Sequence, residues 1–236
     1  MRWMYPDFEE TGLLYHWTDP VRLPSIFTNG LRANHPDHVN PEENYSRIYE
    51  VMWKHRPDDV PDWVDPRHCV FAVMNHRRPD DEKAPGGKPV VAHVGISVTD
   101  EIARRSWVAH TAFADWVYHP EAAGYFDTPE RTAFYNDFVE PTCARAYWRT
   151  SLSFERNLVV RHDHLQWQVG YVEVLICMDP VPPERLSLES VGVVGQERRA
   201  CVLRSQCADE FARAEARLRR GEEPTEELDR IADCVR

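Results

Sequence analysis

Short apolar runs alternate with stretches of helical spacing along the chain, and this pattern predicts an α+β fold. Residues 13–17 form the first apolar run and predict a strand. Asp19 and Pro20 follow it and predict the start of a helix, because an Asp side chain accepts hydrogen bonds from first-turn amides and proline fits that turn. Asn29-Gly30 predicts the end of this helix in a left-handed conformation.

Four further segments have the pattern of strands. Residues 69–74 are continuously apolar, which predicts a central strand covered on both faces. Residues 90–98 alternate, with Ala92, Val94 and Ile96 on one side and a more polar face that includes His93. Two more strands are expected over residues 171–178 and 186–194.

Three segments have the spacing of helices. Asn40-Pro41 predicts a helix start, and residues 100–137 are expected to be mainly helical, with an N-cap at Thr128. From residue 199 onward a helical stripe predicts a C-terminal pair of helices. We therefore expect a main domain over residues 1–198 and a C-terminal helical segment over residues 199–236, which packs on that domain or on a partner.

The amino-acid composition and the net charge limit which kinds of protein this chain can be. The 236 residues are 42% hydrophobic and 28% charged, as in an ordinary globular protein. A net charge of −11 argues against binding duplex nucleic acid by bulk attraction but leaves room for a local basic cleft.

The N-terminus has no apolar signal segment, so we expect a cytoplasmic protein that does not bind membranes. The cysteines show neither Cys-x-x-Cys nor zinc-finger spacing and are expected to be reduced packing residues: Cys69, Cys143, Cys177, Cys201, Cys207 and Cys234.

Two polar residues interrupt apolar strands. Glu173 lies in the middle of Val172-Glu173-Val174, where an ionised carboxylate is costly to bury unless it is paired. It either lines a cleft or lies on the wet face of an edge strand or a half-exposed strand. His16 projects from the first predicted strand, where it either binds a ligand or is a satisfied, half-buried histidine.

The surroundings of these two residues resemble a known family. Residues 14–19, with His16-x-Thr18, and residues 23–31, with Leu23-Pro24 and Gly30-Leu31, resemble the opening motif of NAD-dependent ADP-ribosyltransferases. Among these enzymes, the motif is closest to that of the DarT-type DNA-modifying toxins. Residues 172–176 and 181–186 are similar to the Glu-Val-Leu strand and Val-Pro-Pro turn of that family.

The resemblance implies a fold of two small packed β-sheets flanked by helices, with NAD as substrate. It implies that Glu173 hydrogen-bonds the ribose 2′-OH and stabilises positive charge at the reacting carbon. A functional arginine is implied near the pyrophosphate, and Arg47 is the first candidate, with Arg67 as the alternative. The remaining residues implied in NAD binding are His16, Trp17, Thr18, Gly30 and Leu31.

The segment before the Glu173 strand is where the family commonly recognises its acceptor. Aromatic and arginine side chains there suit a single-stranded nucleic acid, and the candidates are Tyr147, Trp148, Arg149 and Arg156. Trp148 and Phe154 are equally explained as core aromatics. Residues 74–79 lack the Asn-Pro-x-x-x-Tyr element of DarT proteins, so specificity for thymidine in DNA does not follow.

The sequence thus predicts a mono-ADP-ribosyltransferase that modifies a macromolecule, with single-stranded DNA or RNA favoured, as a toxin or defence effector with a possible antitoxin. Two alternatives stay open: an NAD-dependent RNA 2′-phosphotransferase, and a non-catalytic binding module of the same fold. No metal is expected, because His162 and His164 lack a third ligand at a telling spacing. No Rossmann or P-loop motif occurs.

Overall fold

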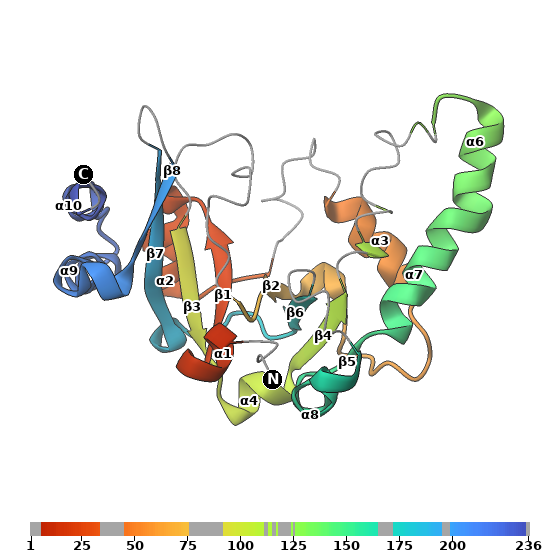
Figure 1. Cartoon of the computed structure of the whole chain (residues 1–236), viewed down its shortest axis with the longest axis horizontal. Coiled ribbons are helices and arrows are strands. Elements are labelled where there is room, and N and C mark those ends of the chain that lie inside the picture. Colours follow the sequence, from red (N-terminus) through yellow and green to blue (C-terminus); the bar gives the residue numbers. More distant parts are fainter. Residues whose placement is uncertain are drawn as a thin grey trace. The chain divides into compact units, whose positions relative to one another are not determined.

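The chain divides into two compact units, each assembled from separate stretches of sequence. The computed structural model describes residues 6–33, 45–75, 92–110, 113–114, 117, 124, 126–164, 172–194 and 199–234. The first unit comprises Met1–Met4, Arg32–Phe71 and Thr99–Asp179, and the second comprises Tyr5–Leu31, Ala72–Val98 and Pro180–Arg236. Helices and two four-stranded antiparallel sheets make up these units, so the α+β prediction is confirmed (Figure 1).

The sheet of the first unit has the strand order β2-β6-β4-β5. Its strands are β2 (Val70–Ala72), β4 (Ser106–His110), β5 (Leu152–Ser153) and β6 (Val172–Ile176). The helical elements of this unit are α3 (Tyr45–Lys54), η3 (Pro66–His68), α4 (Asp100–Arg104), α6 (Pro129–Phe134), η6 (Tyr135–Val139), α7 (Glu140–Arg149) and α8 (Phe154–His164).

Helices α3 and α7 cover one face of this sheet. Ala109 of β4 and Leu175 of β6 belong to the buried cluster on that face. The cluster also contains apolar side chains of α3 and α7, namely Ile48, Val51, Met52, Ala144, Tyr147 and Trp148. Burial of this face against two helices is the main source of its stability, because the hydrophobic gain grows with the apolar area removed from water.

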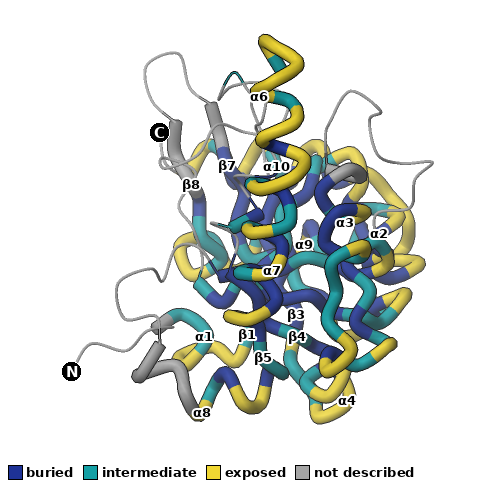
Figure 2. The backbone as a smooth tube through the Cα atoms, turned by 90° about the vertical axis from the view of Figure 1, so that its right-hand side faces the viewer, coloured by how far each residue is buried: buried dark blue, intermediate teal, exposed yellow. Residues whose placement is uncertain are grey.

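Helix α7 continues the helical path that begins at α6. Thr128 caps α6 by accepting a hydrogen bond from the Arg131 amide, as predicted, and the π-helical segment η6 joins α6 to α7. Figure 2 shows α6 as largely exposed, whereas α7 has buried positions along its length. The sheet-facing part of this long helix is therefore its α7 end.

The sheet of the second unit has the order β1-β3-β7-β8. Its strands are β1 (Leu13–Thr18), β3 (Ala92–Ser97), β7 (Leu186–Val194) and β8 (Arg199–Leu203). Its helical elements are α1 (Pro6–Thr11), η1 (Pro20–Arg22), α2 (Leu23–Asn29), η8 (Pro183–Arg185), η9 (Arg204–Gln206), α9 (Ala208–Leu218) and α10 (Thr225–Asp233).

The predicted start and stop signals around α2 are confirmed. The Asp19 carboxylate accepts a hydrogen bond from the Val21 amide at 3.1 Å and so caps η1. Gly30 ends α2 with a φ of +86°, a left-handed conformation that favours glycine.

A β-bulge interrupts the pairing of β3 with β7. His93 pairs with Ser190 but Val94 pairs with Leu188, so Glu189 is the extra residue. Helix α9 provides a partner for the backbone here, because Glu215 accepts a hydrogen bond from the Leu188 amide at 2.7 Å. The bulge thus ties the C-terminal helices to the sheet.

Three sequence predictions about elements are wrong. Strand β2 lies at the edge of its sheet and is only three residues long, so it is not central. Ser106–His110 is a strand within the segment expected to be mainly helical. Arg199–Leu203 is a strand paired with β7, so the helical segment begins only at Ala208. Strand β4 pairs with β5 and β6, which are distant in sequence, and such pairing overrides the local helical pattern.

The expectation of reduced cysteines is wrong for four of the six. Cys69 and Cys177 form a disulfide in the first unit, and Cys207 and Cys234 form one in the second. Cys143 is a free thiol, and burial raises its pKa. Among the described helices, none is long and apolar enough to cross a membrane.

Candidate functional site

Glu173 of β6 is held by a hydrogen bond from a buried tyrosine. The hydroxyl of Tyr147 donates to Oε1 of Glu173 over 2.7 Å. Tyr147 is fully buried in α7, whereas Glu173 is partly exposed. One carboxylate oxygen is therefore fixed from the protein side, while the side chain as a whole keeps access to solvent.

The position of Glu173 in the sheet distinguishes between the two interpretations of the sequence. Strand β6 lies between β2 and β4, so Glu173 is not on an edge strand. It pairs with Ala109 of β4, and Leu175 two positions later shares its face. Since this is the face that α3 and α7 cover, Glu173 does not lie on a wet outer face. It is a paired carboxylate beside a hydrophobic core.

The sequence of α7 explains why Tyr147 points at the sheet. Its buried residues recur at helical spacing: Glu140, Ala144, Tyr147 and Trp148. The Trp148 indole anchors this face to α3 by donating a 2.7 Å hydrogen bond to the Met52 carbonyl oxygen. Its ring packs edge-on against the Tyr147 ring, with centroids 5.2 Å apart. The Tyr147 ring therefore packs against an anchored neighbour, which restricts where its hydroxyl points.

Electrostatics keep Tyr147 in the role of donor. Burial, and then the negative charge of Glu173, raise the pKa of Tyr147 well above its ordinary value. Its hydroxyl stays protonated, so it remains a hydrogen-bond donor to the carboxylate. A carboxylate held in this way can stabilise positive charge that develops nearby, without reorganising first.

Two of the predicted acceptor-binding residues have a different role. Tyr147 and Trp148 are 0% and 2% exposed, so their rings are not free to stack on a base. The core interpretation of Trp148 and Phe154 is confirmed, because Phe154 is also 2% exposed. Arg149 and Arg156 are exposed and stay candidates for acceptor binding.

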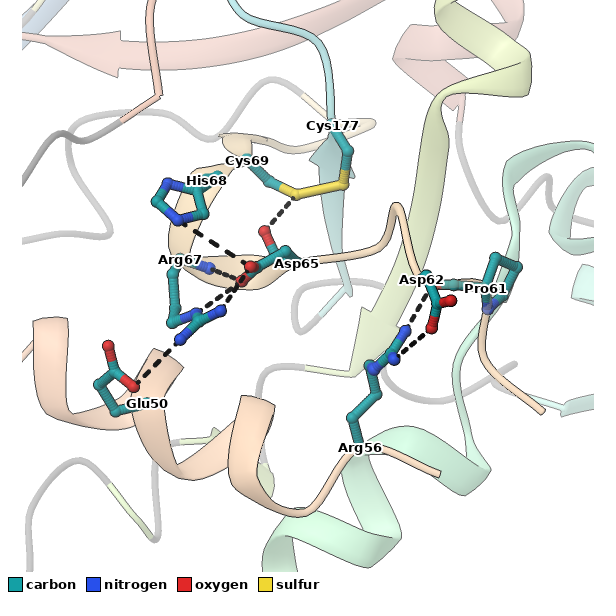
Figure 3. A network of polar contacts seen from close by, with 9 residues as sticks. All are labelled: Glu50, Arg56, Pro61, Asp62, Asp65, Arg67, His68, Cys69 and Cys177. Atoms are coloured by element: carbon teal, nitrogen blue, oxygen red, sulfur yellow. Dashed lines mark hydrogen bonds and ion pairs between the residues drawn. A yellow bond between two sulfur atoms is a disulfide. The ribbon is translucent and has the colours of Figure 1, made fainter. Parts of the chain in front are cut away.

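Arg67, an NAD-binding candidate, is held by acidic neighbours within the first unit. Its Nε and Nη2 donate to the two carboxylate oxygens of Asp65 at 2.9 and 2.7 Å, and Glu50 lies 3.5 Å from Nη1 (Figure 3). The guanidinium also lies over the Trp53 ring, 4.2 Å from its centroid. These contacts give Arg67 a structural role in joining η3 to α3.

The charge of Asp65 is maintained by this pairing. Burial alone would raise the pKa of Asp65, but the side-chain and backbone hydrogen bonds from Arg67 outweigh it and lower the pKa. Asp65 also caps η3 by accepting from the Arg67 amide at 3.0 Å. Cys69, which forms the disulfide with Cys177, follows directly after η3.

Arg47, the other arginine candidate, lies on α3 two positions before Tyr49. Its side chain is outside the described part of the structure. The same holds for the side chains of His162 and His164 in α8. Within the residues that the structure describes, no three His, Cys, Asp or Glu side chains group closely enough to hold a metal ion.

The residues of the first motif lie on two opposite faces of β1 in the second unit. His16 and Thr18 pair with Val94 and Ala92 of β3, whereas Trp17 pairs with His93. Because side chains alternate along a strand, Trp17 points away from the face that His16 and Thr18 share. The three predicted NAD-binding side chains therefore do not line one face. The Trp17 ring instead packs edge-on against the His93 ring, 5.6 Å between centroids.

Gly30 and Leu31 are explained by backbone packing. A Cβ atom on Gly30 would lie 2.5 Å from the Val181 carbonyl oxygen, closer than any side chain allows. Leu31 and Val181 exchange backbone hydrogen bonds of 3.0 and 2.8 Å. Since the Leu31 side chain is 3% exposed, it contributes to the core rather than to a binding surface.

The hydrogen bond from Tyr147 to Glu173 was not predicted from the sequence. The buried residues of α7 recur at helical spacing, and this pattern predicts that Tyr147 faces the core rather than solvent.

Comparison of the chain with protein-family models, with curated proteins and with solved structures finds no match.

Proposed function

We propose that this protein is a mono-ADP-ribosyltransferase that transfers ADP-ribose from NAD to a macromolecular acceptor, with Glu173 as its catalytic carboxylate. The observation that carries the proposal is the 2.7 Å hydrogen bond by which buried Tyr147 holds Glu173 in the middle of a sheet. A charged carboxylate beside a hydrophobic core costs free energy unless it is solvated or hydrogen-bonded, and the Tyr147 hydroxyl supplies such a bond.

The chemistry requires little more of the protein than fixed negative charge. In the transfer, the bond between the ribose C1′ and nicotinamide breaks and nicotinamide leaves with the electron pair. The acceptor forms the new bond to C1′ and releases a proton to solvent. Glu173 would accept a hydrogen bond from the ribose 2′-OH and stabilise the positive charge that develops at C1′. The sequence motif around His16 and Thr18 supports NAD as the substrate.

A nucleic-acid acceptor is part of the proposal. It is supported by Arg149 and Arg156, which are exposed at the end of α7 and in α8, in the segment that precedes the Glu173 strand. Arginine guanidinium groups suit phosphate contacts. The net charge of −11 favours recognition through such local contacts over bulk attraction.

The test is transfer of label from adenylate-labelled NAD to separate pools of single-stranded DNA, RNA and lysate protein. Wild type should label one pool and release nicotinamide, and Glu173→Gln should lower the rate by about 10²–10³, as when one preorganised electrostatic group is lost. Glu155→Gln is the matched control: this glutamate is exposed on α8, and its loss should leave the rate within about twofold. A wild type that neither releases nicotinamide nor labels any pool would refute the proposal.

A further inference from the structure

The hydroxyl of Tyr147 approaches Glu173 from the hydrophobic side of the sheet. We propose that Tyr147 is a positioning residue, which holds the carboxylate of Glu173 in one orientation and in its ionised form and thereby sets the lower pH limit of activity. The activity part of this inference rests on the proposed transferase function, whereas the state of the carboxylate can be tested without it.

Geometry makes the contact directional. The donor–acceptor distance of 2.7 Å is that of a strong hydrogen bond to a charged oxygen. Tyr147 is 0% exposed, and its neighbour Trp148 is anchored to the Met52 carbonyl, so the phenol has little freedom to turn away. A tyrosine side chain also has few rotatable bonds, so fixing its hydroxyl as a donor costs little conformational entropy.

The described residues of the neighbouring strands place apolar side chains beside Glu173. Strand β2 consists of Val70, Phe71 and Ala72, and the residue opposite Glu173 on β4 is Ala109. His110, the next residue of β4, has its side chain on the other face of the sheet.

Among the α3 side chains that the structure describes, Tyr49 is the titratable one that acts on Tyr147. Tyr49 lies near enough to Tyr147 to raise the pKa of its phenol. The other charged side chains of α3 whose positions are described, Glu50 and Lys54, are 64% and 68% exposed. Neither Glu50 nor Lys54 therefore faces Glu173.

Loss of the Tyr147 hydroxyl has a defined electrostatic consequence. A donor that bonds the ionised form of a carboxyl lowers its pKa, so removing the donor raises it. We expect Tyr147→Phe to raise the pKa of Glu173 by about one unit, because a hydrogen bond to a charged group has a corresponding free energy. The ring and its packing against Trp148 are kept in this variant.

The first experiment measures the carboxyl directly in the free protein. Glutamate side chains labelled with ¹³C are titrated by NMR, and the signal missing in Glu173→Gln assigns Glu173. The matched control is Tyr135→Phe, because Tyr135 is also 0% exposed and donates to a backbone oxygen, that of Val117 at 3.2 Å. Tyr147→Phe should shift the Glu173 titration upward and Tyr135→Phe should not. Identical titrations in wild type and Tyr147→Phe would overturn the proposal.

The second experiment measures nicotinamide release as a function of pH. Tyr147→Phe should lower kcat about ten- to a hundredfold below the shifted pKa, leave KM within about twofold, and move the acid limb to higher pH. In a Glu173→Gln background, Tyr147→Phe should not lower kcat further, because Tyr147 acts through Glu173. A lower Tm with an unchanged pH profile would show a merely structural role and refute the proposal.

One outcome separates this inference from the proposed function, and a second replacement covers a variant that does not fold. If wild type has no turnover while the NMR titration shifts as expected, the transferase proposal fails and the control of the carboxylate stands. If Tyr147→Phe does not fold, 3-fluorotyrosine incorporated at position 147 keeps the ring and strengthens the donor. That replacement should lower the pKa of Glu173, and an unchanged pKa would overturn the inference.

Discussion

Each unit has a four-stranded antiparallel sheet with a hydrogen-bonded polar pair, and the two pairs differ in exposure. In the first unit, Tyr147 comes from a helix and Glu173 keeps access to solvent. In the second unit, Nδ1 of His93 lies 2.5 Å from Oγ of Ser190 on the neighbouring strand. Those two residues are 2% and 0% exposed.

This difference separates a structural pair from a candidate functional one. His93 and Ser190 are buried at paired positions beside the bulge, where their hydrogen bond specifies the register of β3 and β7. No substrate can reach groups that are so fully enclosed. Glu173 is supported by an equally buried partner but is itself partly exposed, and this combination of a fixed donor with an accessible acceptor suits the proposed catalytic role.

Removal of the disulfides, of which each unit has one, is expected to change stability the most. Cys69 and Cys177 are 108 positions apart, and Cys207 and Cys234 are 27 apart. A longer closed loop restricts the unfolded chain more, so the double Ser variant of the first pair should lose about 5 kcal/mol and that of the second about 3–4 kcal/mol.

Urea denaturation of the two double variants, beside wild type under oxidising conditions, measures this difference. Dithiothreitol should destabilise wild type and leave a variant that lacks all four cysteines unchanged. Equal losses for the two pairs would show that loop length does not govern their contribution.

The second prediction tests the contrast between the polar pairs. Ser190→Ala leaves the enclosed His93 ring without its partner on β7 and should cost about 1–3 kcal/mol of unfolding free energy. Any transferase activity should be unchanged once the protein is folded. Thermal unfolding and nicotinamide release, measured on the same samples, check both parts. A loss of activity without a loss of stability would place His93 and Ser190 in the functional machinery.

A smaller effect concerns Asp65 in the first unit. Because its folded pKa is lowered, its pairing with Arg67 stabilises the protein fully above the unfolded pKa of about 4. This contribution is lost as the pH falls through the lower folded pKa. Asp65→Asn should cost about 1–2 kcal/mol at pH 7 and remove that part of the acid dependence, as denaturation at pH 3 to 7 would show. Asp58→Asn provides the control, because this carboxylate is exposed in the same unit.

The smallest expected effect concerns His55. Burial, and then the positive charge of Lys54, lower its pKa in the folded protein. The unfolded state then binds the proton more readily, so stability falls as the pH drops from about 6.5 towards the folded pKa. His55→Gln should flatten this part of the stability profile, an effect below about 1 kcal/mol that is measurable by Tm from pH 5 to 8. A steeper profile in the variant would contradict the assignment.

Local chemistry made much of the fold predictable. The Asp19 cap, the Gly30 stop and the Thr128 cap are decided by neighbouring atoms, and all three are confirmed. Strands β4 and β8 were missed because each is short and is specified by its partner strand, which is β6, far along the chain, for β4 and the preceding strand β7 for β8. Local periodicity carries no information about such partners.

In the candidate site, too, the feature set by neighbouring residues was predicted and the feature set by a distant residue was not. Glu173 was identified from its own strand, since a charge among apolar neighbours is visible in five residues. Its partner Tyr147 lies 26 positions earlier, and its orientation depends on the α7 stripe and on the sheet it faces. The cysteine pairs were missed for a similar reason, because no spacing rule connects positions so far apart.

The interleaving of the two units along the chain has a consequence for synthesis on the ribosome. The sheet of the second unit needs β1 near the start of the chain and both β7 and β8, which end at Leu203. At about 5–20 residues per second, the first strand waits on the order of ten seconds or more for its sheet to be completed. Until then its apolar residues lack their final cover, which makes the nascent chain a client for chaperones.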